Sequence, residues 1–170
     1  MNPMNALDDL LRKGSEDSGA LVVAAHPDDE TIGAGILLSR LPGPRVLHLA
    51  GGAREELTAA MALAGVPLQN LLRIEGVSDR EAAAHLPRLA REIAVLLRQL
   101  RPKVVMTHAY EGGHPDHDAA AIAVRAAAQL LRRGRAPVPD LFEMALYHAL
   151  RQSGSRYPEF IDDRLRHRNA

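Results

Sequence analysis

The sequence predicts an α/β fold: a Rossmann-like, doubly wound, mostly parallel sheet of about five strands in the order 3-2-1-4-5, with helices on both faces. Short apolar runs alternate with helical stretches along the chain, which is the pattern of βαβ units. The first run, Leu21–Ala25, is apolar throughout, as expected of a strand buried on both faces. No repeat or break in composition divides the chain. We therefore expect a single domain over residues 1–170, with its core over 20–150 and a polar tail over 151–170.

The first half of the chain is expected to supply three strands and two helices. The strands are predicted at Leu21–Ala25, Arg45–Ala50 and Leu71–Ile74, and the helices at Thr31–Leu41 and Glu55–Ala64. Pro42 and Pro44 end the first helix because a proline cannot continue it. Gly65 is the expected C-cap of the second helix.

The second half of the chain continues the alternation. A long helix is predicted over Arg80–Leu100, where leucines and Ile93 recur every three or four residues, and Arg101-Pro102 stops it. The remaining elements are a strand at Lys103–Thr107, an alanine-rich helix at His117–Arg133 and a last strand at Leu141–His148.

Composition narrows the classes of function. The formal net charge is zero and aromatic residues make up 3% of the chain, so nothing favours a nucleic-acid partner. The chain has no cysteine, which excludes disulfides, thiolate ligands and a cysteine nucleophile. The N-terminal sequence lacks the basic start and apolar stretch of a signal peptide, and no apolar run is long enough for a membrane span. A cytoplasmic protein is the expectation.

Two polar clusters follow predicted strands. The segment "HPDDE", His26–Glu30, comes directly after the first strand, and "GGHPDHD", Gly112–Asp118, follows the fourth. Ligands of such sheets bind outside the carboxyl ends of the strands. Strands one and four are neighbours in the predicted order, so we expect the two clusters to meet at the topological switch point.

The residue types in these clusters suit metal-assisted hydrolysis. Two histidines and one carboxylate can hold Zn²⁺ and leave a position for water. A further carboxylate could take a proton from that water, and a further histidine could donate to a developing oxyanion. Spacing alone does not say which histidine or aspartate is a ligand, and another divalent metal is compatible with the same donors.

The two motifs carry a family resemblance. "AAHPDDE" after an apolar strand and "GGHPDH" later in the chain resemble the LmbE-like, or PIG-L-type, de-N-acetylases, as does the helix "AREELTAAMALAGV". The resemblance extends from about Leu21 to His148. It implies a zinc-dependent hydrolase with one Zn²⁺ per chain, which removes an N-acetyl group from an amino sugar or a related N-acylated small molecule through a metal-activated water.

The resemblance also implies roles for individual residues. His26, Asp29 and His117 match the metal ligands of the family. Asp28 matches the general base. His114 matches the residue that stabilises the tetrahedral intermediate and protonates the leaving amine.

Other positions near the motifs carry weaker expectations. The resemblance implies that Asp116 contacts an imidazole and orients it. It also implies that Arg54 matches an arginine that contacts the substrate. Glu30 is expected to cap or begin the following helix and is not assigned as a ligand. For His108 and His148, pocket and structural roles are both open. His48 and His85 are expected to be structural or solvated, and Tyr110 and Glu111 could form a pocket wall.

Two departures from the family bear on the substrate. The loop after strand two, "AGGAREEL", is shorter than is usual, and the tail is short. A more open pocket, or one completed by a second subunit in a homo-oligomer, is therefore a hypothesis. Two other functions stay open: hydrolysis of another bond such as a phosphoester, for which Asp28, Glu30 and Asp118 supply surplus acids, and a non-catalytic sugar- or nucleotide-binding module.

Overall fold

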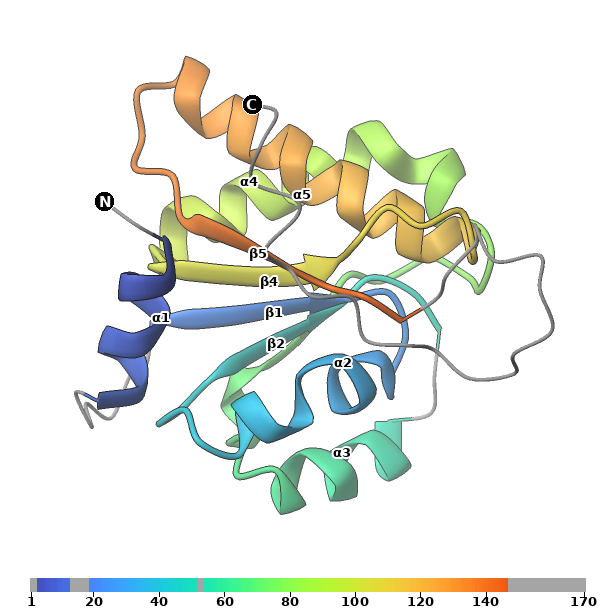
Figure 1. Cartoon of the computed structure of the whole chain (residues 1–170). Helices are drawn as coiled ribbons and strands as arrows, with labels where there is room; N and C mark the ends of the chain where they lie inside the picture. Colours follow the sequence, from blue (N-terminus) through green and yellow to red (C-terminus); the bar gives the residue numbers. More distant parts are fainter. Residues whose placement is uncertain (1–2, 13–18, 52–53, 147–170) are drawn as a thin grey trace, which may run out of the picture.

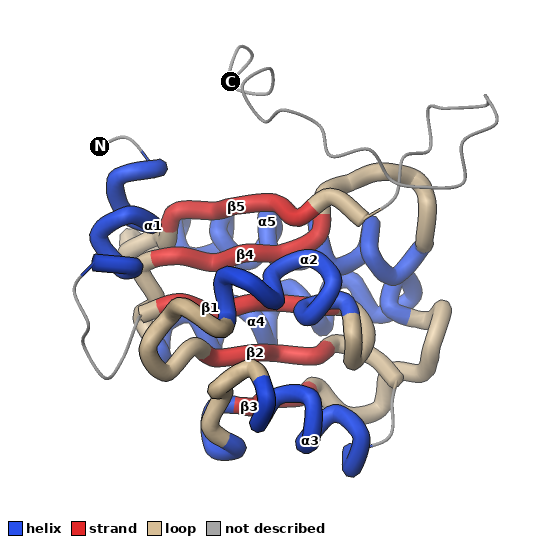
Figure 2. The backbone as a smooth tube through the Cα atoms, turned by 60° about the horizontal axis from the view of Figure 1, so that its bottom comes forward, coloured by secondary structure: helices blue, strands red, loops and turns tan. Residues whose placement is uncertain are grey.

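A computed structural model describes residues 3–12, 19–51 and 54–146, and it confirms the predicted fold. Five parallel strands form one sheet in the order β3-β2-β1-β4-β5 (Figures 1 and 2). The strands are β1 (Ala20–Ala24), β2 (Arg45–His48), β3 (Leu71–Arg73), β4 (Val104–His108) and β5 (Asp140–Met144). The α-helices are α1 (Pro3–Arg12), α2 (Asp29–Leu38), α3 (Arg54–Leu63), α4 (Leu86–Leu100) and α5 (Pro115–Arg133), and two 3-10 turns are η1 (Leu68–Asn70) and η2 (Ala82–His85).

The molecule has three layers, with helices covering both faces of the sheet. Helices α2 and α3 lie on one face, and α4 and α5 on the other (Figure 2). Successive side chains of β1 point to opposite faces. Leu21 and Val23 pack in the cluster that contains residues of α4 and α5, whereas Val22 and Ala24 pack in the cluster that contains residues of α2 and α3. Burial on both faces explains why this strand is apolar throughout.

The helix ends follow from identifiable residues. Gly65 has φ +74°, its N–H donates to the carbonyl of Ala62, and the N–H of Val66 donates to that of Met61. These two bonds form a Schellman C-cap, which confirms the expected role of Gly65.

The predicted helix over Arg80–Leu100 is wrong over residues 80–85. Arg80 has φ +68°, which no residue of a right-handed helix adopts, and α4 begins at Leu86 after η2. Pro87 lies in the first turn of α4, where its missing N–H costs no helical hydrogen bond.

Other boundaries differ by a few residues. Helix α5 begins at Pro115, two residues before the predicted start, because proline is well suited to the first helical position. Helix α1 was not predicted. Its Leu10 packs in a cluster with Leu41 and Val104. Strand β5 ends at Met144, and the predicted end of this strand at His148 lies outside the described residues, as does the tail over 151–170.

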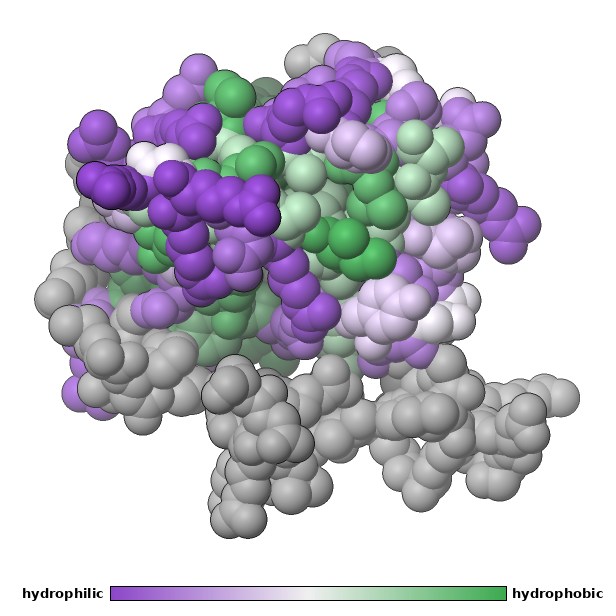
Figure 3. Space-filling model, turned by 90° about the horizontal axis from the view of Figure 1, so that it is seen from above, coloured by the Kyte–Doolittle hydropathy of each residue, from purple (hydrophilic) through white to green (hydrophobic). Residues whose placement is uncertain are grey.

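The outer face of the helical layer on α4 and α5 is mixed in character. Figure 3 shows hydrophilic side chains over much of this face, with hydrophobic ones between them. Within the part of the chain that the structure describes, no helix has the length and apolarity needed to cross a membrane.

Candidate metal centre

The two polar clusters meet, as the predicted strand order requires. The carboxyl ends of β1 and β4 lie beside one another, at the right of Figure 1, and helices α2 and α5 begin there. The ring of His117 lies 4.1 Å from that of His108, 4.7 Å from that of His114 and 5.6 Å from that of His26, measured between ring centroids. Four imidazoles and the carboxylate of Asp29 thus share one site.

Asp29 is at the centre of this site. It is 5% exposed, and the backbone N–H of His26 donates to its Oδ2 at 2.8 Å. Three imidazole nitrogens surround the carboxylate: His26 Nδ1 lies 3.4 Å from Oδ2, His108 Nε2 lies 3.4 Å from Oδ2, and His117 Nε2 lies 3.3 Å from Oδ1. Burial raises the pKa of Asp29, but the neighbouring imidazoles outweigh it and hold that pKa well below its usual range.

These separations fit a shared metal ion. A charge-assisted N–H···O bond is about 2.7–2.9 Å long, so 3.3–3.4 Å is long for a direct ion pair. Two ligands bound tetrahedrally to Zn²⁺ at about 2.0–2.1 Å lie about 3.3–3.4 Å apart. Two imidazoles and one carboxylate are a chemically suitable donor set for zinc, and His26 Nδ1 and His117 Nε2 each lie at a ligand–ligand separation from Asp29, although from different carboxylate oxygens.

The other ring nitrogen of His26 is held by Asp116. His26 Nε2 lies 2.9 Å from Asp116 Oδ2, and this fully buried carboxylate also accepts the backbone N–H groups of Arg80 and Ala82. The neighbouring carboxylate of Asp29 raises the pKa of His26 to about 9, against the effect of burial and with further help from Asp116. Loss of the proton on Nδ1 would leave Nε2–H donated to Asp116, which is the carboxylate–histidine–metal arrangement of many zinc sites.

His108 is in the site but is poorly suited to bind a metal through Nε2. The backbone N–H of Ala25 donates to His108 Nε2 at 3.0 Å, so that nitrogen carries a lone pair and this hydrogen bond occupies it. Burial lowers the pKa of His108, which agrees with a neutral ring. The structure gives His108 both of the roles left open for it. The side chain is buried, as a structural residue is, and it lies beside Asp29 at the candidate site.

Geometric grouping of the described residues gives three overlapping clusters that could hold a cation. They are His26 with His114 and His117, Asp29 with His108 and His117, and His26 with Asp79 and Asp116. The predicted ligands His26, Asp29 and His117 are spread over the first two clusters, with His117 in both.

His114 uses one nitrogen to cap a helix. It is the N-cap of α5, and its Nδ1 accepts the backbone N–H of Asp116 at 3.2 Å. A neutral His114 with an accepting Nδ1 carries its proton on Nε2. Burial, with His117 and His26 nearby, lowers the pKa of His114, which favours the neutral ring. The site therefore contains an N–H donor that is free of the helix cap.

Asp28 has an unusual backbone conformation and a side chain that does not cap its helix. It is the N-cap of α2 with φ +124° and ψ −32°, and its carboxylate makes no cap hydrogen bond. Such a conformation costs an L residue about 1–3 kcal/mol, and strain of this kind gathers at functional sites. Partial burial and repulsion from Asp29 and Glu30 raise the pKa of Asp28, which makes its carboxylate a better proton acceptor.

Some polar residues here were not predicted from the sequence. Asp79, in the segment after β3, places Oδ1 3.1 Å from His26 Nε2. The segment follows a strand of the same parallel sheet, which is the one signal that could have found it. The contact between Glu30 and His48 was not predicted either: the two side chains are fully buried, and His48 Nε2 lies 2.7 Å from Glu30 Oε2.

Other predicted positions lie at the edge of the site or beyond the description. Helix α3 begins at Arg54, whose side chain lies outside the described residues, as does all of His148. Tyr110 is exposed, and Glu111 accepts the backbone N–H of Leu146, which ties this loop to the end of β5.

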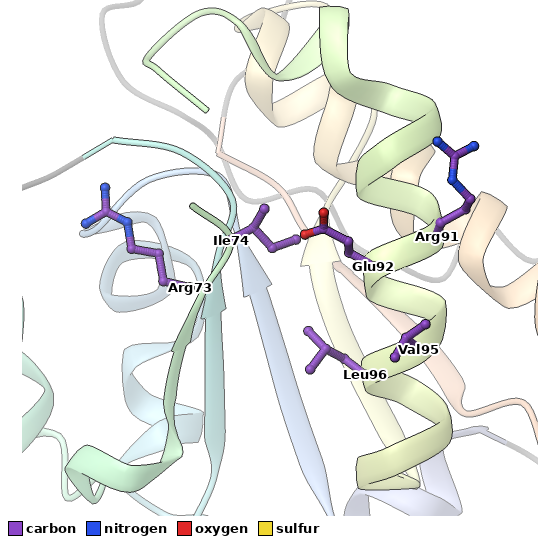
Figure 4. Close-up of a pocket in the computed structure, with 6 residues that line it drawn as sticks. All are labelled: Arg73, Ile74, Arg91, Glu92, Val95 and Leu96. Carbon is purple, nitrogen blue, oxygen red and sulfur yellow. The ribbon is translucent and has the colours of Figure 1, made fainter. Parts of the chain in front are cut away.

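A groove at the edge of the sheet is a separate feature. It encloses about 370 Å³ between the end of β3 and the side of α4 (Figure 4). Its lining residues are Arg73, Ile74, Arg91, Glu92, Val95 and Leu96. It contains no histidine and shares no residue with the metal-ligand clusters, so it is not the candidate centre.

The chain is thus a parallel α/β protein whose switch point carries histidines and aspartates, donors that suit a divalent metal ion. The chain matches the PIG-L family, described as GlcNAc-PI de-N-acetylase, over residues 42–128, just over half of its length. It belongs to this family. The matched range contains the second cluster, and the first cluster precedes it.

Individual relatives agree with this assignment. The 1D-myo-inositol 2-acetamido-2-deoxy-alpha-D-glucopyranoside deacetylase 2 of Catenulispora acidiphila is 33% identical, over 75% of this chain and 57% of its own length. The corresponding deacetylase of Thermobifida fusca is 32% identical, over 66% of this chain and 55% of its own. The chain thus spans little more than half the length of these relatives.

Solved structures share the fold. A conserved protein of Thermus thermophilus, TT1542, is 30% identical, with a TM-score of 0.63 over 76% of this chain and 67% of that one. The N,N'-diacetylchitobiose deacetylase of Pyrococcus horikoshii is 18% identical, with a TM-score of 0.54 over 75% of this chain and 60% of that one. At that identity the second likeness concerns the fold alone.

Proposed function

We propose that this chain is a zinc-dependent N-deacetylase that hydrolyses the acetamido group of an amino sugar or a related small molecule. The observation that carries the proposal is the surrounding of Asp29. His26 and His117 lie at ligand-like distances from this carboxylate, and the carboxylate of Asp28, which makes no cap hydrogen bond, is adjacent to it in the chain. One zinc ion per chain would be held by His26, Asp29 and His117.

Each residue has a separate task in this proposal. Bound zinc would polarise the acyl carbonyl and lower the pKa of a water molecule. Asp28 takes a proton from the attacking water, for which its raised pKa suits it. Asp116 holds Nε2 of His26 so that Nδ1 faces Asp29, and two backbone hydrogen bonds, from Arg80 and Ala82, fix the Asp116 carboxylate in turn.

His114 acts on the oxyanion that develops on the substrate. Because Nδ1 accepts the cap hydrogen bond, Nε2–H is the group left to donate to the developing oxyanion. The proton that Asp28 took from the water can pass to the leaving amine when the C–N bond breaks. The products are acetate and a free amine.

The substrate class rests on the relatives. Two of them are named as deacetylases of a 2-acetamido-2-deoxy-glucopyranoside. We propose an N-acetylated amino sugar here, with Arg54 at the start of α3 as a substrate contact. A pocket that is more open because of the short loop after β2, or that a second subunit completes in a homo-oligomer, stays a prediction. The single domain and the cytoplasmic location also stay predictions.

The surplus acids give little support to phosphoester hydrolysis. A second metal about 3.5–4 Å from the first would need free carboxylates. Glu30 accepts from His48, Thr31 and the backbone of Asp28, and Asp118 accepts the backbone N–H groups of Glu111 and Gly112. Those two carboxylates are therefore engaged elsewhere.

The test combines metal analysis with acetate release. The purified chain, stripped of metal and reloaded with zinc, would be assayed against a panel of N-acetylated amino sugars and simple acetamides. We expect one equivalent of zinc and zinc-dependent release from at least one sugar, with His117→Ala losing both. Full release by the stripped protein, or by His117→Ala, would refute the proposal.

A further inference from the structure

The buried pair of Glu30 and His48 has no part in the chemistry described so far. We infer that Glu30 is a positioning residue, and this inference rests on the proposed role of Asp28 as general base. The carboxylate of Glu30 holds the backbone of Asp28 so that the side chain of Asp28 faces the reaction instead of capping α2. His48, on the neighbouring strand, holds Glu30 in place.

The contacts of Glu30 carry this inference. Glu30 is 0% exposed, and its Oε2 accepts the backbone N–H of Asp28 at 3.1 Å and lies 2.7 Å from His48 Nε2. Its Oε1 accepts the hydroxyl of Thr31 at 2.8 Å. His48 is also 0% exposed, so both partners are fixed by the packing of β2 against α2. A buried carboxylate with this many directed contacts is rigid.

The bond to Asp28 resembles half of a capping box, but it comes from the second residue of α2 and not from the third, as in that motif. In that motif a glutamate reaches back to the N–H of the N-cap residue, while the N-cap side chain accepts an N–H of the first turn. Here the first bond is made and the second is missing, because the Asp28 carboxylate makes no cap bond. The carbonyl of Asp28 meanwhile accepts from Thr31 and Ile32. Hydrogen bonds thus fix both ends of a residue whose φ of +124° is unfavourable, and its side chain makes no cap hydrogen bond.

A matched pair of variants at Glu30 tests the inference. Glu30→Gln keeps an oxygen for Asp28 and His48 and an amide for Thr31, so we expect the kcat for acetate release to stay within about threefold of the original. Glu30→Met has similar length but no acceptor. We expect its kcat to fall at least about 30-fold while KM and the zinc Kd stay within about threefold, because the ligands and the substrate contacts are unchanged. Thr31→Val is the control, since it removes a contact of Glu30 without touching the Asp28 N–H.

A readout in the metal-free protein makes the test independent of turnover. Hydrogen exchange of the Asp28 amide, measured by NMR, should be slow in the original chain and in Glu30→Gln, and at least about tenfold faster in Glu30→Met. If Glu30→Met does not fold, His48→Leu, which leaves Glu30 without its strand partner, replaces it with the same expected direction in both measurements.

The outcomes separate the two hypotheses. A purely structural pair would lower the melting temperature of Glu30→Met but leave kcat of the folded protein intact, and that result overturns the inference. An Asp28 amide that exchanges equally slowly in Glu30→Met overturns it as well. No acetate release from the zinc-loaded original chain would instead refute the proposed function, and the amide measurement would still decide the role of Glu30.

Discussion

Helices α2 and α5 both begin at the candidate metal centre, and their N-caps are used in opposite ways. The cap of α5 is a side chain: His114 accepts the N–H of Asp116 through Nδ1 and keeps Nε2 for chemistry. The cap residue of α2, Asp28, makes no such bond with its side chain, and Glu30 reaches back to its N–H instead.

The difference follows from the number of polar atoms that each task needs. An imidazole has two nitrogens, so one can cap the helix while the other donates a hydrogen bond to the oxyanion. A general base must present its carboxylate to water, and a carboxylate that accepts backbone N–H groups at a helix N-terminus has a lowered pKa and is a weaker base. Keeping Asp28 out of the cap, at the expense of a strained φ, preserves its basicity.

The largest effect is expected at Asp28. Asp28→Asn removes the proton acceptor but no cap bond, so acetate release should fall about a thousandfold, in the middle of the range for general bases. The free energy of unfolding should change by less than about 0.5 kcal/mol. Steady-state kinetics and chemical denaturation measure the two. Retention of more than a tenth of the rate would contradict the assigned role.

A pair of variants at His114 separates its two nitrogens. His114→Asn keeps a good N-cap and loses Nε2, so release should fall about a hundredfold with little change in stability. His114→Ala should lose as much rate and also about 1 kcal/mol of unfolding free energy. Equal stability of the two variants would show that the Nδ1 cap contributes nothing.

The next effect concerns the orientation of a ligand. Asp116→Asn weakens the hold on His26 Nε2, so the affinity for zinc should fall by about 10- to 100-fold, as is usual for such partners of metal ligands. Competition with a fluorescent chelator measures the affinity. Asp79→Asn is the control, because that residue is 66% exposed and its contact with His26 is solvated; an equal loss in both variants would argue against a special role for Asp116.

The smallest effect is the release of backbone strain. Glycine adopts positive φ freely, so Asp28→Gly should raise the free energy of unfolding by about 1 kcal/mol while abolishing release. Asp28→Ala keeps a β-carbon and should not gain this stability. Thermal or denaturant unfolding of the two proteins provides the comparison, and a less stable Asp28→Gly would show that the conformation is unstrained.

Most of the architecture was predictable from the sequence because it depends on local patterns. The continuous apolar run of β1 required cover on both faces, and the alternation of strands and helices required parallel neighbours. Once β1 and β4 were adjacent, the two polar clusters had to meet. The first turn of the helix predicted from Arg80 failed because apolar spacing does not report a positive φ.

The details of the site depend on contacts between distant residues. Asp116 meets His26 across 90 positions of sequence, and His48 meets Glu30 from another strand. Which nitrogen of His108 or His114 accepts a hydrogen bond depends on backbone groups that only the folded loops bring near. Motif spacing names the residues that gather, but it does not determine how each ring is turned.

The central claim is that two adjacent aspartates have different tasks, with Asp29 on the metal and Asp28 free of it. Calorimetric titration of zinc into metal-free protein tests this directly. We expect the original chain and Asp28→Asn each to bind one equivalent of zinc, with dissociation constants within about threefold of one another. For Asp29→Asn we expect a Kd at least about 100-fold weaker. Equal affinities of Asp29→Asn and the original chain, or loss of the site in Asp28→Asn, would contradict it.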